Sequence, residues 1–256
     1  MFYKNSNIVQ VEKLSINKLK WIRNLHSKKF RESEGFYIAE GEKILRESVT
    51  VDPSSINFIV CTKTTAEILE NYSEFDLFIA SPNEFERISL LKAPQGILLV
   101  LKSKISAVSS LNLTENILVL DNIQDPGNLG TILRTADWFG IKQVYCSKNT
   151  VECYNPRVVQ ASMGSLFRTT IIYGDLPEFL SQQKLPIYGA LLNGQSCYSQ
   201  KIAKNAILII GNEGNGISKE IIDLIQHPIT IPGDGNGESL NVAVACGILL
   251  SHWVKS

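Results

Sequence analysis

The sequence predicts an α/β protein made of two successive α/β units. Apolar runs of strand length alternate with segments of helical periodicity, and a stretch rich in serine, asparagine and lysine at 103–115 interrupts this alternation. Beyond it, the strand candidates are apolar throughout and separated by helices, which predicts a parallel sheet covered on both faces. We therefore expect a smaller unit at 1–102, a linker at 103–115 and a larger parallel-sheet domain at 116–256.

In the smaller unit, residues 13–49 are predicted to be mainly helical, with FYIAEGEKILRES (36–48) forming a strand that turns into a helix. Three further strands and two helical pieces follow. The strands are expected at 56–62, 76–81 and 96–102, and the helical pieces near 64–72 and 82–91.

In the larger domain, six apolar runs are predicted to be strands, with helices between them. They lie at 117–122, 143–147, 168–173, 186–192, 206–211 and 228–232. A last helix begins near Ser239 and is apolar nearly all round, with small residues along 243–247. Because a surface helix shows a polar stripe, this one is predicted to be buried inside the domain or in a subunit interface. The small residues allow close approach of a partner backbone, which favours the interface.

The composition is that of a soluble globular protein. The chain has 256 residues, 44% of them hydrophobic and 20% charged, which suffices to bury a core in one large or two modest domains. No run reaches the roughly 18 apolar residues that span a bilayer. The first residues lack the apolar core of a signal peptide, so we expect no membrane association and a cytoplasmic location.

The cysteines do not indicate a metal site. They are five, an odd number, and none are spaced as CxxC, which disfavours zinc and favours a reducing compartment. A nucleophilic cysteine is the alternative. The chain has only three histidines to serve as its base, and none is adjacent to a cysteine in sequence.

The charge pattern leaves one candidate surface for nucleic acid. The net charge is zero, which argues against a protein that coats nucleic acid electrostatically. However, residues 13–31 carry seven Lys/Arg and no acidic residue, with Trp21 and Phe30 among them. This segment is predicted to be either a solvated helix face or a strip that contacts RNA backbone. The RNA-binding candidates in it are Lys28, Lys29 and Arg31.

The first strand of the larger domain leads into a polar loop and a helix. In DNIQDPGNLGTILRTADWFG (121–140), Pro126-Gly127 is a turn signal, Asn128 is a predicted N-cap, and Gly140 closes the helix. Arg134 lies on the face opposite the apolar stripe. Capping and solvation by themselves account for Asn128 and Arg134. However, ligands bind at the carboxyl ends of strands in open α/β sheets.

Two more glycine-rich loops follow strands. GNEGNGIS (211–218) has the spacing GxxGxG, and Glu213 disfavours phosphate but suits a cationic or hydroxyl-bearing ligand. PGDGNGESLN (232–241) ends at a helix start for which Ser239 is a plausible N-cap. Taken alone, each loop is explained as a connection between a strand and a helix. The occurrence of three such loops, each with polar residues at a strand end, favours a site.

These loops lie in DNIQDPGNLGTILRTA, LIIGNEGNGIS and ITIPGDGNGESLNVAVACGILL. The three segments resemble, in this order, the signature motifs of the SpoU (TrmH) family of RNA 2′-O-ribose methyltransferases, within the SPOUT superfamily. QASMGSLFRTTI (160–171) resembles a further family segment, so the likeness runs over 117–254. More weakly, FYIAEGEKILRES with PQGILLV (94–100) resembles the family's N-terminal substrate-binding domain, which is related to ribosomal protein L30e.

The resemblance implies a fold, a cofactor and an assembly. The C-terminal parallel-sheet domain would contain a deep trefoil knot and form a homodimer, and the L30e-like domain before it would bind RNA. S-adenosylmethionine would be held in a bent form by the knotted loops. By the family's motifs, the residues around the reacting centre are Asn128, Arg134, Glu213, Ser239 and Asn241. Those at the cofactor are Gly211, Gly216, Ile231 and Leu240.

Transfer of a methyl group to a ribose 2′-hydroxyl requires positioning and loss of a proton. The family's arginine is often assigned as the base, but lowering an arginine pKa from about 12.5 to 7 costs about 7 kcal/mol. Stabilisation of the developing alkoxide, or a grip on the adjacent phosphate, is the more economical role for Arg134, with Asn128 and Ser239 orienting the hydroxyl. The predicted substrate is structured RNA, with rRNA favoured. The alternatives are a tRNA 2′-O-methyltransferase and a non-catalytic RNA-binding or ribosome-assembly protein.

Overall fold

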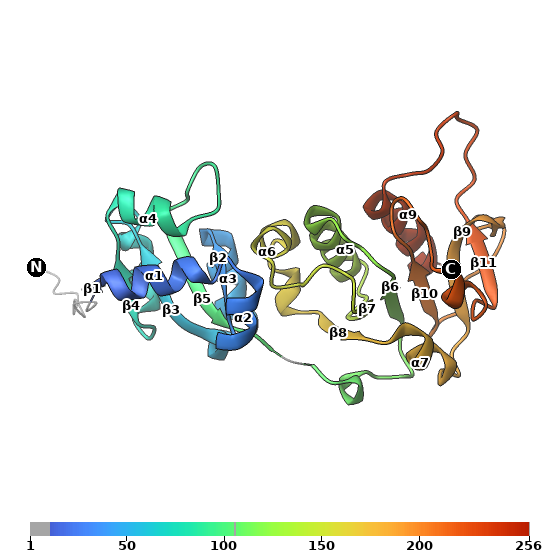
Figure 1. The fold of residues 1–256 in the computed structure, drawn as a ribbon, viewed down its shortest axis with the longest axis horizontal. Coiled ribbons are helices and arrows are strands. Elements are labelled where there is room, and N and C mark those ends of the chain that lie inside the picture. Colours follow the sequence, from blue (N-terminus) through green and yellow to red (C-terminus); the bar gives the residue numbers. More distant parts are fainter. Residues whose placement is uncertain (1–10, 105, 256) are drawn as a thin grey trace, which may run out of the picture. The chain divides into compact units, whose positions relative to one another are not determined.

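The computed structural model describes residues 11–104 and 106–255, with Val11 described through its backbone only. It divides after Lys104 into two compact units, called unit 1 and unit 2 below (Figure 1). The predicted linker at 103–115 spans this division. All of it after Lys104 belongs to unit 2, and Leu111 is part of that unit's core. The first ten residues of the predicted smaller unit lie outside the described residues.

Unit 1 is built on a five-stranded mixed sheet in the order β1-β4-β3-β5-β2. Three of its strands are parallel: β1 (Val11–Lys13), β4 (Leu77–Ile79) and β3 (Ile56–Cys61). β5 (Ile97–Lys102) runs antiparallel to both β3 and β2 (Phe36–Glu40). The predicted strands are therefore confirmed. The three-residue strand β1 was not predicted, since so short a segment carries no alternation of its own.

Two helices of unit 1 begin at polar side chains that cap them. α1 (Ile16–Asn24) is capped by the Ser15 hydroxyl, and α4 (Pro82–Ile88) begins with a capping box formed by Ser81 and Glu84. Both bury apolar residues in one cluster with β3 and β5. The remaining helices are α2 (Lys28–Glu34) and α3 (Glu42–Val51), with 3-10 turns at Pro53–Ser55 and Ala66–Tyr72.

Unit 2 contains a six-stranded sheet in the order β11-β9-β10-β6-β7-β8, and every pair in it is parallel. The predicted parallel sheet is therefore confirmed. The strands are β6 (Ile117–Leu120), β7 (Gln143–Ser147), β8 (Thr170–Gly174), β9 (Ile187–Ser196), β10 (Ile207–Ile210) and β11 (His227–Thr230). β6 is the first of these strands in the sequence. It lies inside the sheet beside β10, which is much further along the sequence.

Helices cover both faces of this sheet (Figure 1). α7 (Leu176–Ser181) and α8 (Lys219–Ile222) share one core cluster with the odd-numbered residues of β6 and β10. On the other face, α5 (Pro126–Trp138) packs against α6 (Pro156–Ser162) and α9 (Val242–Lys255). α5 and α6 approach closely at Gly130, where an added Cβ would lie 2.5 Å from the Ala161 Cβ. The 3-10 turns of unit 2 lie at Val108–Ser110 and Ser165–Phe167.

The cysteines are buried as free thiols. Burial raises the pKa of Cys61 to about 11 and those of Cys153 and Cys246 to about 12. A thiol with so high a pKa is protonated at neutral pH, which argues against the nucleophilic cysteine kept as an alternative above. Among the described residues, no helix is long and apolar enough to cross a membrane, and no cluster of three acidic, histidine or cysteine residues suits a metal ion.

Candidate active site

The first loop of the site runs from β6 into α5. The helix is capped by Asp125, whose Oδ1 accepts a hydrogen bond from the Asn128 backbone N–H at 2.8 Å. The prediction that Asn128 is the cap is therefore wrong, because the turn Pro126-Gly127 lies inside the first helical turn and not before it. Gly140 closes the helix as predicted, with a φ of 76°. The consequence is that the Asn128 side chain is free to reach other loops.

The second loop follows β10 and is pinned to the first. Asn212 and Gly216 exchange backbone hydrogen bonds, and the Asn212 Oδ1 accepts from the N–H groups of Gly214 and Asn215 at 2.9 and 3.0 Å. The Asn212 Nδ2 donates to the Asn122 carbonyl at 2.8 Å. Sequence reasoning assigned no role to Asn212. The signal was present, however, since an asparagine two residues before a glycine is typical of an Asx turn.

Gly211 explains why the second loop begins with glycine. An added Cβ there would lie 2.3 Å from both the Gly216 carbonyl carbon and the Ile217 backbone nitrogen. Only a residue without a side chain allows the two ends of the loop to approach in this way. Gly216 also needs its glycine, because its φ is 68°.

The third loop ends at α9, and its cap is Asn241. The Asn241 Oδ1 accepts from the backbone N–H groups of Ala243 and Val244 at 2.9 and 3.2 Å. The prediction that Ser239 caps this helix is wrong: α9 begins at Val242, three residues later, and Ser239 is exposed. Since the Asn241 oxygen is used for capping, its Nδ2 group is left to donate elsewhere.

One hydrogen-bond chain joins the three loops. The Asn128 Nδ2 donates to the Glu213 Oε1 at 2.8 Å, and the Asn128 Oδ1 accepts from the Asn241 Nδ2 at 3.1 Å. The second Glu213 oxygen lies 3.3 Å from the Asn212 Nδ2. Three of the five predicted catalytic residues, 85 and 113 positions apart in the chain, thus meet directly. We call Asn128, Glu213 and Asn241 the amide–carboxylate chain.

The other two predicted catalytic residues do not join this chain. Arg134 lies on the exposed face of α5, and its side chain makes no hydrogen bond or ion pair with residues 11–104 or 106–255. Ser239 is exposed in the third loop. An exposed, unpaired guanidinium is able to bind an anionic or hydroxyl-bearing ligand that arrives from solvent.

The predicted cofactor residues all lie at the carboxyl edge of the sheet. Gly211 follows β10, Ile231 follows β11, and Leu240 precedes α9, while β9 lies between β10 and β11. β9 pairs with β10 only as far as Gly189 and continues to Ser196, so Leu192 lies beyond the end of β10 with 74% of its surface exposed. Bare glycine backbone together with exposed leucines suits a cofactor held through backbone groups and apolar contacts.

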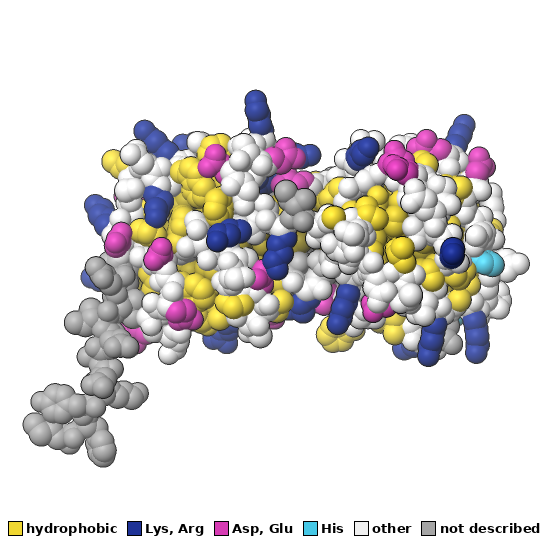
Figure 2. Space-filling view, turned by 90° about the horizontal axis from the view of Figure 1, so that it is seen from below, with side chains coloured by type: hydrophobic (Ala, Val, Ile, Leu, Met, Phe, Trp, Pro, Cys, Tyr) yellow, Lys and Arg dark blue, Asp and Glu magenta, His cyan; other side chains and the backbone are white. Residues whose placement is uncertain are grey.

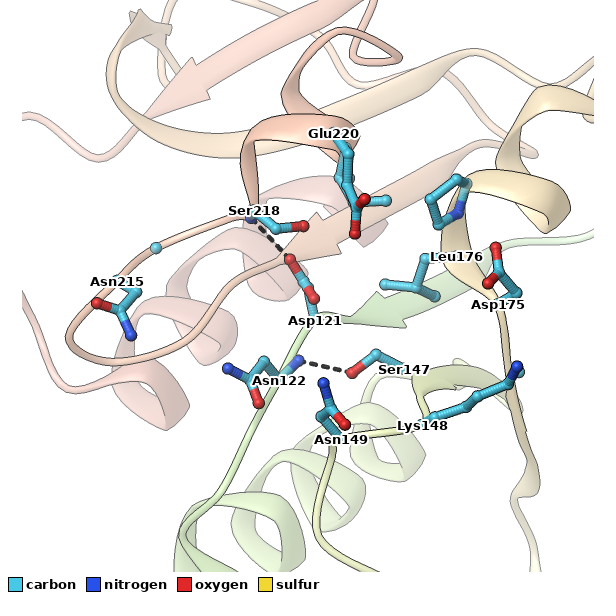
Figure 3. Close-up of a pocket in the computed structure, with 14 residues that line it drawn as sticks. Asp121, Asn122, Ser147, Lys148, Asn149, Asp175, Leu176, Asn215, Ser218 and Glu220 are labelled. Carbon is cyan, nitrogen blue, oxygen red and sulfur yellow. Dashed lines mark hydrogen bonds between the residues drawn. The ribbon is translucent and has the colours of Figure 1, made fainter.

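A separate cavity of about 300 Å³ lies at the same edge, against the second loop (Figure 3). Its walls come from the ends of β6, β7 and β8 and from the start of α7 and α8. Polar and apolar surface contribute about equally to its lining, and the polar part includes the side chains of Asp121, Asn122, Ser147 and Glu220. None of the predicted site residues lines it except Gly216, and sequence reasoning did not foresee it.

The basic segment of unit 1 is only partly available to a ligand. Arg31 is 4% exposed and donates to the carbonyls of Leu25 and His26, where α1 ends. The prediction that Arg31 binds RNA is therefore contradicted by its burial. Trp21 and Phe30 also pack inward against the core of unit 1. Lys28 and Lys29 are exposed on α2, as required for contact with RNA.

Comparisons with known proteins agree with this geometry. Residues 115–251 match the SpoU rRNA Methylase family, and residues 17–99 match the MRM3-like substrate binding domain. The chain is 29% identical to the 23S rRNA (guanosine(2553)-2′-O)-methyltransferase RlmP of Bacillus subtilis, over 95% of this chain and 98% of that protein.

Solved structures have the same fold. A TrmH-family protein of Porphyromonas gingivalis superposes with a TM-score of 0.83 and 36% identity, over 94% of this chain and 98% of that one. An AdoMet-bound rRNA methyltransferase of Sinorhizobium meliloti superposes with a TM-score of 0.84 and 26% identity, over 94% and 95% of the two chains. Because the family model matches more than half of the chain and covers all three loops, this protein belongs to the SpoU rRNA methylase family.

Proposed function

We propose that the protein transfers a methyl group from S-adenosylmethionine to the 2′-hydroxyl of a ribose in rRNA. The observation that carries this function is the amide–carboxylate chain, which brings one residue from each of the three loops to a single point. The B. subtilis relative acts on a guanosine 2′-hydroxyl of 23S rRNA, and the S. meliloti relative binds AdoMet. A guanosine of 23S rRNA is therefore the first substrate to test.

In this reaction the cofactor supplies an activated methyl group, and the protein must place the hydroxyl in line with it. Glu213 is held in one orientation, because Asn128 of the amide–carboxylate chain donates to one of its oxygens and the neighbouring Asn212 donates to the other. A carboxylate fixed in this way accepts a hydrogen bond from the ribose and orients it. Ser239 and Asn241 are proposed to complete the contacts from the third loop.

Arg134 is proposed to stabilise the alkoxide that develops on the 2′-oxygen, or to hold the adjacent phosphate. It projects from α5 six residues after Asn128 and has no partner among the described residues. A guanidinium stays charged at neutral pH, so stabilising a negative charge suits it better than accepting a proton. For the cofactor, Gly211, Gly216, Ile231 and Leu240 are proposed as the contacts, mainly through their backbones.

Two finer features of the fold are part of the proposal. One is a trefoil knot in unit 2, supported by the insertion of β10 between β9 and β6 and by the return of α9 to pack against α5. The other is that unit 1 is an L30e-like domain that captures structured RNA. It is supported by the match of residues 17–99 to a substrate-binding domain. Residues 1–102, 103–115 and 116–256 are accordingly proposed as RNA-binding domain, linker and catalytic domain.

Unit 2 is proposed to form a homodimer through α5 and α9. Trp138 on α5 is 85% exposed, and Val244 on α9 is 53% exposed. The two helices are in contact, since an added Cβ at Gly247 would lie 3.6 Å from the Thr135 Cγ2. The apolar side chains thus lie on adjacent helices, and a second copy of the same helix pair would cover them.

Val244→Glu is expected to dissociate this dimer, because a charge would be buried against an apolar partner surface. The dissociation constant should rise about thirtyfold or more, the factor for losing a contact of about 2 kcal/mol. Sedimentation equilibrium measures it. Ile16→Glu makes the same kind of change at an exposed apolar residue of unit 1 and should leave the dimer intact. An unchanged constant for Val244→Glu would assign the dimer to another surface.

The function is tested with rRNA and tRNA from a strain that lacks the gene. Purified protein with radiolabelled S-adenosylmethionine should methylate rRNA, and the label should map to one ribose 2′-oxygen. Labelling of tRNA alone would support the first alternative. If calorimetry detects no binding of S-adenosylmethionine and neither RNA is labelled, the protein is a non-catalytic RNA-binding member of the fold.

The remaining basic candidates have a test of their own. Lys29→Glu should weaken rRNA binding severalfold at low salt and flatten its salt dependence, since it removes a contact with phosphate. Lys43→Glu makes the same charge change on α3, also at an exposed residue, and should have a smaller effect. Filter binding at several salt concentrations measures both. Equal affinities for both variants and the wild type would make the segment a solvated helix face.

A further inference from the structure

We propose that the cavity against the second loop binds a guanine base of the RNA substrate. This inference rests on the proposed function, since it assigns the cavity to the same RNA. Sequence-specific proteins reach RNA mainly in loops, where bases are unstacked, and an unstacked base beside the modified ribose needs a place to bind. A volume of about 300 Å³ is at the small end of the range for ligand sites, which suits a single base and not a length of chain.

Asp121 is the main reason to assign a ligand to this cavity. It is only 6% exposed and lines the cavity just after the end of β6 (Figure 3). Its Oδ2 accepts a hydrogen bond from the Ser218 N–H at 2.8 Å, whereas its Oδ1 has no partner among the described residues and is accessible from the cavity. The backbone bond holds the carboxylate in place, and its free oxygen is able to accept a hydrogen bond from a ligand.

Two further carboxylates face the same space. Glu220, at the start of α8, lines the cavity and makes no hydrogen bond or ion pair in the described part of the chain. Asp175 caps α7 through its Oδ1, which accepts from the Glu178 N–H at 3.0 Å, and this leaves its Oδ2 available. The lining of the cavity contains one cationic side chain, Lys148, besides these three carboxylates.

This distribution of charge selects the part of a nucleotide that enters. Three carboxylates repel phosphate, so the RNA backbone stays outside. A carboxylate is an acceptor only, and it pairs best with two adjacent N–H donors. The Watson–Crick edge of guanine presents two such donors, N1–H and the 2-amino group. Adenine and cytosine present one amino group beside an unprotonated ring nitrogen. That nitrogen is an acceptor, so it cannot pair with a carboxylate oxygen and is repelled by it.

The cavity is also connected to the reacting centre. The second loop is a wall of the cavity at Asn215 and Gly216, and it carries Glu213 three residues before Gly216. Asn122 contacts both the cavity and the second loop. Its side chain lines the cavity, and its backbone carbonyl accepts a hydrogen bond from the Asn212 Nδ2. A base bound in the cavity is therefore separated from the amide–carboxylate chain only by this loop.

The test is a titration of the ¹⁵N-labelled protein, saturated with S-adenosylmethionine, with free nucleosides. Guanosine should shift the amide resonances of Gly216 and Ser218. Inosine, which lacks the 2-amino group, should bind more weakly, and adenosine more weakly still. Glu220→Gln should weaken guanosine binding about tenfold, the effect of losing one hydrogen bond to a charged group. Asp223→Asn removes the same charge at the end of α8, outside the cavity, and should have no effect.

With rRNA as substrate, Glu220→Gln should raise KM about tenfold and leave kcat nearly unchanged, as expected for uniform binding. The inference is overturned if guanosine shifts no cavity resonance, if adenosine binds as tightly, or if Asp223→Asn matches Glu220→Gln. An unchanged KM would also overturn it. A wild-type protein that methylates no RNA overturns the proposed function instead, and this outcome differs from normal methylation with an unaffected Glu220→Gln variant.

Discussion

Arg134→Lys is expected to lower kcat for methyl transfer at least about a hundredfold, while the affinity for S-adenosylmethionine changes less than about threefold. Lysine keeps the charge but loses the planar pair of N–H donors that binds an oxyanion or a phosphate at two points. Losing one such donor to a developing charge costs a factor of about 100 to 1000. The loss cannot be ascribed to folding, because Arg134 is exposed and unpaired among the described residues.

Single-turnover kinetics with bound RNA measure this effect, and calorimetry measures the cofactor affinity. Arg157→Lys, at an exposed arginine in the first turn of α6, is the matched control and should be close to wild type. The dependence of the rate on pH separates the proposed role of Arg134, which is to stabilise charge, from the role of base often assigned to the family's arginine. If Arg134 only stabilises charge, the lysine variant is slower by the same factor at every pH. If Arg134 is the base, the profile shifts with the lower ordinary pKa of lysine. A near-normal rate would remove Arg134 from the mechanism.

Gly211→Ala is expected to have the second large effect. The added methyl group would lie 2.3 Å from the backbone of Gly216 and Ile217, and backbone atoms cannot move aside as a flexible side chain does. Overpacking of this kind lowers the free energy of unfolding by about 1 to 3 kcal/mol. Since the opening of the second loop also displaces Glu213 and the proposed cofactor contacts, the affinity for S-adenosylmethionine should fall at least about tenfold.

Urea unfolding and calorimetry measure these two losses. Gly214→Ala is the matched control, because its Cβ would meet only the Asn212 Oδ1 at an ordinary 3.7 Å. It should stay within about 0.5 kcal/mol of the wild type, as is usual for exposed positions. Equal stability and cofactor affinity in the two alanine variants would contradict the close approach at Gly211.

Most strands could be predicted from the sequence because each is a local pattern. β6, β10 and the others are short apolar runs bounded by turn residues, and such runs separated by helices lead to a parallel sheet. The order of the strands was not accessible in this way. That β10 pairs with β6, across about 90 residues, depends on packing of the whole unit.

The site illustrates the same limit. The motif residues Asn128, Glu213 and Asn241 could be named from the sequence, but the hydrogen bonds between them could not. Caps were misplaced by two or three residues, because several asparagine, aspartate and serine residues compete at each helix start. Asp125 caps α5 and Asn241 caps α9. Because these residues do the capping, the Asn128 side chain and the Asn241 Nδ2 group remain free for the site.

Burial explains the failure at Arg31. By composition it belongs to a basic strip, but α1 ends at Asn24 and α2 begins at Lys28, so the strip does not lie on one helix face. The break turns the Arg31 guanidinium inward, onto the carbonyls at the end of α1. A charged residue used as a helix C-cap carries no sequence signal that separates it from an exposed one.

The amide–carboxylate chain also makes the alignment of the reactive groups depend on nearly the whole of unit 2. A single carboxamide, that of Asn128, joins residues that lie 85 and 113 positions away in the chain. Asn241, which supplies the second of these contacts, is also the residue that caps α9. A chain truncated before Asn241 therefore loses a contact of the first motif together with the start of its final helix.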